Sequence, residues 1–182
     1  RGIIDHVDSQ DVVTFTGSAY TGRKLKSLPQ FTERSVPFNL EADSLNAAIL
    51  GKYATPGTVE FDLFIKEVTR EITVKAGQKC TAVRRIIVPE DFIDEVQAGI
   101  VKRLASTTIG DPSLEGVRMG SLAVMSQVDR LKESVNALSK SQEIVYGDMD
   151  NFEVSGADKN KGAFFSPILF RNDNPYKNTD VH

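Results

Sequence analysis

The segment VVTFTGSAYTGRK, residues 12–24, changes its pattern halfway along. Its first half is a β-branched and aromatic run that stops at Gly17, which is typical of a strand followed by a tight turn. Ser18 stands where a helix cap is preferred, so we expect a helix from there towards Pro29. A second strand-like run follows at residues 36–40. Strand, turn, helix and strand together indicate an α/β arrangement.

Residues 58–77, TVEFDLFIKEVTREITVKAG, predict a long amphipathic helix. Thr58 is a suitable cap, acidic residues occupy the first turn, and apolar residues recur at helical spacing. These apolar residues are Phe61, Phe64, Ile65, Val68 and Ile72. The helix therefore brings the chain to Gly77 and Cys80.

The rest of the chain alternates in the same way. Pro89 with the acidic residues after it opens another helix, and Ser126 with Asp129 forms a capping box for a third. The polar stretch 147–162 favours a loop. Strand-like runs occupy residues 83–88, 143–146 and 164–170. We expect the α/β class, with a mixed or largely parallel sheet flanked by helices.

Composition limits the classes of function. With 40% hydrophobic residues, 26% charged residues and a net charge of -3, the chain is typical of a soluble globular protein. No clustered basic run favours nucleic acid as a partner, and no apolar run approaches the roughly 18 residues of a membrane span. A single cysteine forms no internal disulfide, so a cytoplasmic location is expected. Both ends of the sequence suggest a piece of a longer chain.

The strand-to-helix turn at residues 17–24 is a candidate phosphate site, because backbone N–H groups at a helix start attract anions. Gly17 and Gly22 have the spacing of a P-loop. However, Arg23 stands where the lysine is required, and Lys24 replaces the hydroxyl residue that binds magnesium. A nucleotide kinase is therefore disfavoured, and an ordinary strand-to-helix turn remains an alternative.

Cys80 is the only cysteine in the sequence. Lone cysteines are often small buried hydrophobic residues, but this one has unusual neighbours. Four basic residues would favour a thiolate if they faced the sulfur, namely Lys75, Lys79, Arg84 and Arg85. His6 and His182 are the only histidines, so a cysteine protease or a zinc site is disfavoured, and we expect no metal.

Glu41 is the candidate general base that such a thiol would need. It directly follows a predicted strand, where an apolar setting can tune a carboxylate for proton transfer. An ordinary charge at a helix N-terminus is the alternative interpretation.

Four motifs, taken in order, resemble the aldehyde dehydrogenase superfamily over nearly the whole chain: FTGSAYTGRKL, NLEADSLNAAIL, GQKCTAVRR and GAFFSPILF. Glu-Ala-Asp-Ser at residues 41–44 is similar to the dehydrogenase half of the bifunctional ring-opening protein of phenylacetic acid degradation. The resemblance implies that residues 1–41 are the C-terminal part of a Rossmann-type dinucleotide-binding domain. Residues 42–182 would be most of the catalytic domain.

The resemblance also implies roles for individual residues. Cys80 would be the nucleophile that forms a thiohemiacetal and then a thioester, and Glu41 would activate the hydrolytic water. The residues expected to contact NAD or NADP are Gly17, Ser18, Thr21 and Gly22. Asp43 departs from the family pattern, which has glycine there.

The substrate implied by the resemblance is an aldehyde, in the subgroup a CoA-linked semialdehyde made by a fused enoyl-CoA-hydratase-like domain. The implied whole protein is a homo-oligomer. The 182-residue chain alone is expected to be inactive, because further site residues of the family fall outside it. A non-catalytic aldehyde-dehydrogenase-like module, kept for structure or binding, is the alternative.

Overall fold

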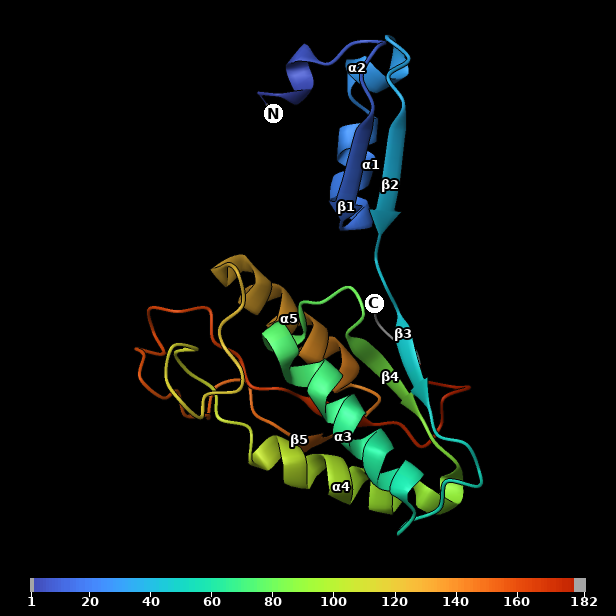
Figure 1. Cartoon of the computed structure of the whole chain (residues 1–182), viewed down its shortest axis with the longest axis vertical. Helices are drawn as coiled ribbons and strands as arrows, with labels where there is room; N and C mark the ends of the chain where they lie inside the picture. The colour runs from blue at the N-terminus through green and yellow to red at the C-terminus, as the bar shows by residue number, and fades with distance from the viewer. Residues whose placement is uncertain (1, 179–182) are drawn as a thin grey trace. The chain divides into compact units, whose positions relative to one another are not determined.

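The computed structural model describes residues 2–178, which form two compact units divided between Leu45 and Asn46 (Figure 1). Each unit has its own helices and its own paired strands, and each is described by itself.

The smaller unit is built around two parallel strands and the helix that connects them. Its elements are η1 (Ile4–His6), β1 (Val13–Gly17), α1 (Ala19–Lys26), α2 (Pro29–Thr32) and β2 (Phe38–Ala42). The register places Val13 opposite Phe38 and Gly17 opposite Ala42. The predicted strand, glycine turn and helix are therefore confirmed.

The second strand begins later than the sequence predicts, at Phe38 instead of Val36. Pro37 has no N–H to donate, and its carbonyl oxygen accepts from the N–H of Val13 at 3.0 Å, just before the ladder starts. Val36 is buried instead, with 3% of its surface exposed.

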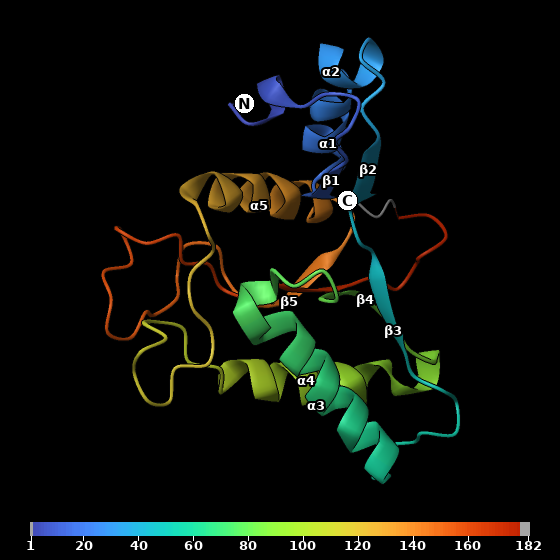
Figure 2. The same cartoon turned by 45° about the horizontal axis from the view of Figure 1, so that its top comes forward.

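The larger unit contains one parallel and one antiparallel strand pair with three helices of 13 residues or more (Figure 2). Its elements are β3 (Asn46–Ile49), α3 (Val59–Thr73), η2 (Val74–Gly77), β4 (Val83–Ile87), η3 (Glu90–Phe92), α4 (Ile93–Ala105), α5 (Met125–Leu138), β5 (Glu143–Tyr146) and β6 (Leu169–Arg171). β3 pairs with β4 in parallel, and β5 pairs with β6 in antiparallel fashion. The expected α/β class with both kinds of pairing is confirmed.

The main core lies where α3 and α4 pack together and against β3. Ile100 and Leu104 on α4 are each only 1% exposed. The buried residues of this cluster are Leu50, Phe61, Ile65, Val68, Val96, Ile100 and Leu104. Three of them are among the five apolar residues that the sequence placed on one face of α3, and the cap by Thr58 is also observed, with Oγ1 accepting from Phe61 N at 3.3 Å. This core fixes the end of α3, from which the chain reaches Cys80.

Two sequence expectations in this unit were wrong in detail. α5 begins at Met125, and the side-chain oxygen of Gln127 accepts from the N–H groups of Ala123 and Val124, so Ser126 and Asp129 do not form the start. Of the predicted strand 164–170, only residues 169 and 170 pair with β5, and the observed strand continues to Arg171. The stretch 147–162 contains no helix or named strand, as expected for a loop.

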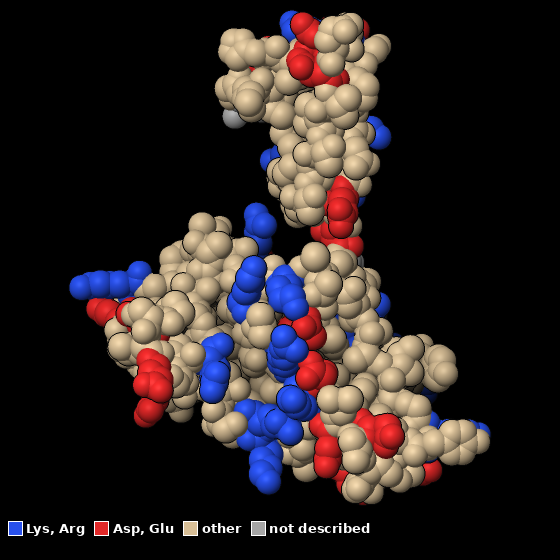
Figure 3. All heavy atoms as spheres, in the orientation of Figure 1, with Lys and Arg blue, Asp and Glu red and all other residues tan. Residues whose placement is uncertain are grey.

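The surface of the larger unit carries charges of both signs. Figure 3 shows basic side chains in a band on one face, with acidic side chains beside them. Several pair directly, such as Arg171 with Asp94 at 2.5 Å, which joins β6 to α4. Across the part of the chain that the structure describes, every helix is too short or too polar to cross a membrane.

Candidate functional site

The chain reaches Cys80 from α3 through three successive residues in the left-handed region. The φ angles of Lys75, Ala76 and Gly77 are 53°, 52° and 69°. A Cβ added at Gly77 would lie 3.1 Å from the carbonyl oxygen of Ile72, tighter than ordinary van der Waals contact. Glycine is therefore favoured here, by its positive φ and above all by the close approach of α3.

Cys80 is exposed, and its backbone is held from β3. The Nδ2 group of Asn46 donates to the carbonyl oxygen of Cys80 at 2.6 Å and to that of Ala82 at 3.3 Å. Asn46 is the first residue of β3, so its side chain extends the contact between the β3 and β4 segments to residues that precede β4. The sequence analysis did not identify Asn46, although it lies within the quoted NLEADSLNAA motif.

Glu71 on α3 contacts the residues on both sides of Cys80. Its two carboxylate oxygens accept from Lys79 Nζ at 2.7 and 2.8 Å, and Oε2 also accepts from the Thr81 hydroxyl at 3.2 Å. The bond from the Lys79 ammonium holds the pKa of Glu71 below its ordinary value. Sequence reasoning missed Glu71, because its nine-residue distance from Cys80 follows no pattern.

Two of the four basic residues near Cys80 are engaged with other groups. The Lys79 ammonium is paired with Glu71, and Arg84 donates to the carbonyl oxygen of Gly77 at 3.2 Å. The positive charge of Lys79 is therefore largely compensated beside the thiol.

Glu41 lies on β2, opposite Thr16 in the parallel register, and it is exposed. Asp43, two residues later, has a φ of 48° and stands at a position where the family pattern has glycine. Aspartate tolerates this region better than most residues. Its Oδ1 also accepts from the N–H of Ala19 at 3.1 Å, so the departure from glycine is accommodated at the start of α1.

The four residues predicted to contact a dinucleotide lie together at this start. Gly17 ends β1, and the Ser18 hydroxyl caps α1 by accepting from Thr21 N at 3.2 Å. Gly22 is buried, and a Cβ there would collide with the side chain of Leu40 on β2. Gly22 therefore keeps α1 close to the strands.

Of the six predicted site residues, five lie in the smaller unit and Cys80 lies in the larger one. Among residues 2–178 there is no group of three or more His, Cys, Asp or Glu that could hold a metal ion; His182 lies outside the described residues.

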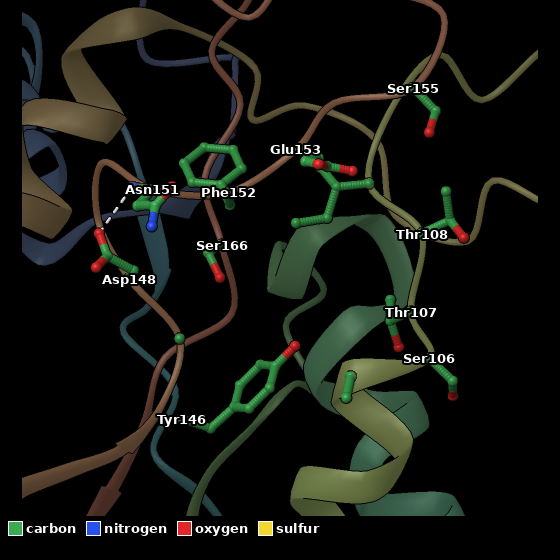
Figure 4. Close-up of a pocket in the computed structure, with 13 residues that line it drawn as sticks. Ser106, Thr107, Thr108, Tyr146, Asp148, Asn151, Phe152, Glu153, Ser155 and Ser166 are labelled. Carbon is green, nitrogen blue, oxygen red and sulfur yellow. Dashed lines mark hydrogen bonds between the residues drawn. The ribbon is translucent and has the colours of Figure 1, made fainter.

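The larger unit also has an open polar pocket of about 690 Å³ that contains none of these predicted residues (Figure 4). Burial raises the pKa of Tyr146, whose hydroxyl points among the lining groups. Asp148 accepts from the N–H groups of Asp150 and Asn151, both at 2.8 Å. The lining residues are Ala105, Ser106, Thr107, Thr108, Ile109, Tyr146, Gly147, Asp148, Asn151, Phe152, Glu153, Ser155 and Ser166. Among these described residues none is a histidine, cysteine, lysine or arginine, so the pocket offers little for nucleophilic chemistry.

Comparison with known families gives a match to the model of the "Aldehyde dehydrogenase family" over residues 2–179. A 3,4-dehydroadipyl-CoA semialdehyde dehydrogenase from Aromatoleum evansii is 43% identical over 182 residues, which are 100% of this chain and 35% of that protein. A 1-pyrroline-5-carboxylate dehydrogenase from Oceanobacillus iheyensis is 26% identical over 179 residues, which are 95% of this chain and 32% of that protein. The chain thus spans about a third of the length of these relatives.

Solved structures show the same fold. Betaine aldehyde dehydrogenase from Staphylococcus aureus, in complex with NAD+, matches with a TM-score of 0.76 and 21% identity over 88% of this chain and 30% of that chain. A mutant of aldehyde dehydrogenase C from Pseudomonas syringae, in complex with NAD+ and octanal, matches with a TM-score of 0.73 and 24% identity over 88% of this chain and 31% of that chain. The fold expected from the sequence motifs is therefore confirmed.

Proposed function

Because the chain belongs to the aldehyde dehydrogenase family, we propose that it is part of an NAD(P)-dependent enzyme that oxidises an aldehyde to an acid. The observation that carries this proposal is the exposed thiol of Cys80 in a loop that α3 and β3 both hold. A lone buried cysteine would need no such support. Residues 1–41 would belong to the dinucleotide-binding domain and residues 42–182 to the catalytic domain.

The substrate proposed for the intact protein is a CoA-linked semialdehyde. The support is the 43% identity, over the whole chain, to a relative named as a 3,4-dehydroadipyl-CoA semialdehyde dehydrogenase. A fused enoyl-CoA-hydratase-like domain that makes the aldehyde, a homo-oligomeric state, a role in phenylacetic acid degradation and a cytoplasmic location belong to the same proposal.

NAD or NADP is the proposed cofactor, and the start of α1 fits one of its phosphates by its donor chemistry. At the positive end of the helix the Ser18 hydroxyl donates to Thr21 Oγ1 at 3.0 Å, which leaves the hydroxyl of the exposed Thr21 as the side-chain donor for a phosphate. A Cβ at Gly17 would lie 2.7 Å from the ring of Phe15, so glycine lets that ring pack at the turn, and Gly22 keeps the helix on β2. When bound, the nicotinamide accepts a hydride from the substrate carbon.

In the proposed reaction, the sulfur of Cys80 adds to the aldehyde carbon, and the backbone N–H of Cys80 donates to the oxyanion that forms. Loss of a hydride from that carbon leaves a thioester on the sulfur. Glu41 then takes a proton from water as the water attacks the thioester carbon. The C–S bond breaks, the acid departs and the thiolate is restored.

Two variants of the intact protein test these roles by the absorbance of the reduced cofactor. Cys80→Ser should abolish turnover, because a hydroxyl without a neighbouring base replaces the thiolate. Glu41→Gln should keep a single burst of reduced cofactor and slow the steady rate by about a hundredfold, because acylation precedes the step that needs the base. Glu33→Gln, another exposed carboxylate of the smaller unit, is the matched control and should behave like the unsubstituted protein.

Retained turnover in Cys80→Ser would exclude this cysteine as the nucleophile. An unaltered steady rate in Glu41→Gln would remove Glu41 from the deacylation step but leave the thiol chemistry in place.

A further inference from the structure

Glu71 bridges the two residues that flank Cys80, although it lies on a different element. Its carboxylate receives two bonds from Lys79 and one from Thr81, so the side chains on both sides of the cysteine are tied to the same group on α3. The Lys79 and Glu71 side chains are 31% and 24% exposed, which shields their pairing from solvent more than an ordinary surface ion pair.

We propose that Glu71 is a positioning residue for the thiol of Cys80. It holds Lys79 and Thr81, and through them it fixes the backbone from which the sulfur projects. Asn46 holds the carbonyl oxygen of Cys80 itself, from β3. The cysteine is therefore fixed by two elements that meet only in the folded unit. This inference rests on the proposed function, in which Cys80 is the nucleophile.

Misplacement of the sulfur has consequences that can be measured. Attack on a carbonyl needs the reacting atoms about 3–3.5 Å apart and aligned, and a misplacement of about 1 Å can cost a hundredfold in rate. In Glu71→Ala we expect kcat to fall by about ten- to a hundredfold with KM for the aldehyde changed by less than about twofold, because the substrate contacts remain. Alkylation of the exposed Cys80 by iodoacetamide near neutral pH should differ by about threefold from that of the unsubstituted protein, because the loop that presents the sulfur is no longer held by Glu71.

The experiment compares three variants of the intact protein. Glu71→Ala removes the bridge, whereas Glu71→Gln keeps acceptor and donor groups and should recover kcat to within about fivefold of the unsubstituted protein. Glu67→Ala is the matched control, because Glu67 lies one turn earlier on α3 and forms an ion pair with Arg70 of the same helix, at 3.1 Å. Alkylation is followed by mass spectrometry of the peptide that carries Cys80, which requires no turnover.

A double-mutant cycle with Lys79→Met separates positioning from a general effect on α3. If Glu71 acts through Lys79, the loss of kcat in Glu71→Ala should be clearly smaller when Lys79 is already methionine. Equal losses in both backgrounds would overturn the proposal, as would a Glu71→Ala variant whose kcat and alkylation rate both match those of Glu67→Ala.

The same experiments distinguish a failure of the positioning role of Glu71 from a failure of the proposed function. If the intact protein oxidises aldehydes and the Glu71 variants behave like the control, the function stands and the positioning role is wrong. If the intact protein oxidises no aldehyde, the proposed function fails, and the alkylation rates still decide whether Glu71 controls the thiol.

Discussion

Replacing Gly77 by alanine tests the geometry that brings α3 to Cys80. Gly77 has a φ of 69°, and the added Cβ would lie 3.1 Å from the carbonyl oxygen of Ile72. The left-handed backbone costs an alanine about 1–2 kcal/mol. The less flexible unfolded chain returns about 0.4–1 kcal/mol of that. The contact with Ile72 adds about 1 kcal/mol at the lower end of overpacking costs, so we expect a net loss of about 1–2.6 kcal/mol in the free energy of unfolding.

Gly57→Ala is the matched control. Gly57 has a φ of 90°, and nothing lies within 4 Å of the Cβ that alanine would add. Gly57→Ala therefore carries the cost of a left-handed backbone without a steric contact. Urea titrations followed by circular dichroism give both free energies. If Gly77→Ala lowers the free energy of unfolding no more than Gly57→Ala does, the close approach of Ile72 does not constrain this turn. Steric contact with Ile72 would then be refuted as a reason for glycine at position 77.

Two further substitutions test local hydrogen bonds. Asn46→Ala should lower the free energy of unfolding by about 1–2 kcal/mol in the same titrations, because it removes the bonds to the carbonyl oxygens of Cys80 and Ala82; an unchanged value would contradict the bonding described. The pKa of Asp148 is lowered from 3.8 by the N–H groups it accepts from, so its stabilising effect is present above that value and is lost as the pH falls through the lower folded-state pKa. Thermal unfolding midpoints should therefore fall less between about pH 5 and pH 2 in Asp148→Asn than in the unsubstituted protein, and equal falls would exclude this contribution.

Local patterns predicted those elements whose stability is encoded nearby. The helix after Thr58 was predicted with its cap and its buried face, because both depend on residues within four positions of each other. The strand 143–146 was placed with its observed bounds, since β-branched and aromatic residues fill it. These elements need little information from the rest of the fold.

Elements that depend on distant partners were missed. β3 contains Ala47 and Ala48, which have little intrinsic preference for a strand, and it forms because β4 lies beside it in parallel. Residues 164–168 have a strand-like composition but no partner in a named strand, so only the last part of that run pairs. Burial and pairing in three dimensions override composition at both places.

The residues of the candidate site also fall into a group that local sequence predicts and a group that it does not. Cys80 and Glu41 stand in motifs that can be recognised in the sequence. The contacts of Asn46 and Glu71 depend on how α3 returns the chain to β4, and no spacing rule relates them to the cysteine. Sequence reasoning can therefore identify a reactive residue more readily than the residues that hold it.

The bond from Asn46 to the carbonyl oxygen of Cys80 also bears on the order in which the larger unit folds. The two residues are 34 positions apart, so the bond cannot form until α3 has folded and β4 has come to lie beside β3. Closing a loop of that length costs conformational entropy, and the bond offsets this cost only after the loop has closed. The backbone around the thiol is thus completed late in folding, and it is lost whenever β3 and β4 separate. A chain in which this strand pair is still open carries the cysteine without the geometry that surrounds it in the folded unit.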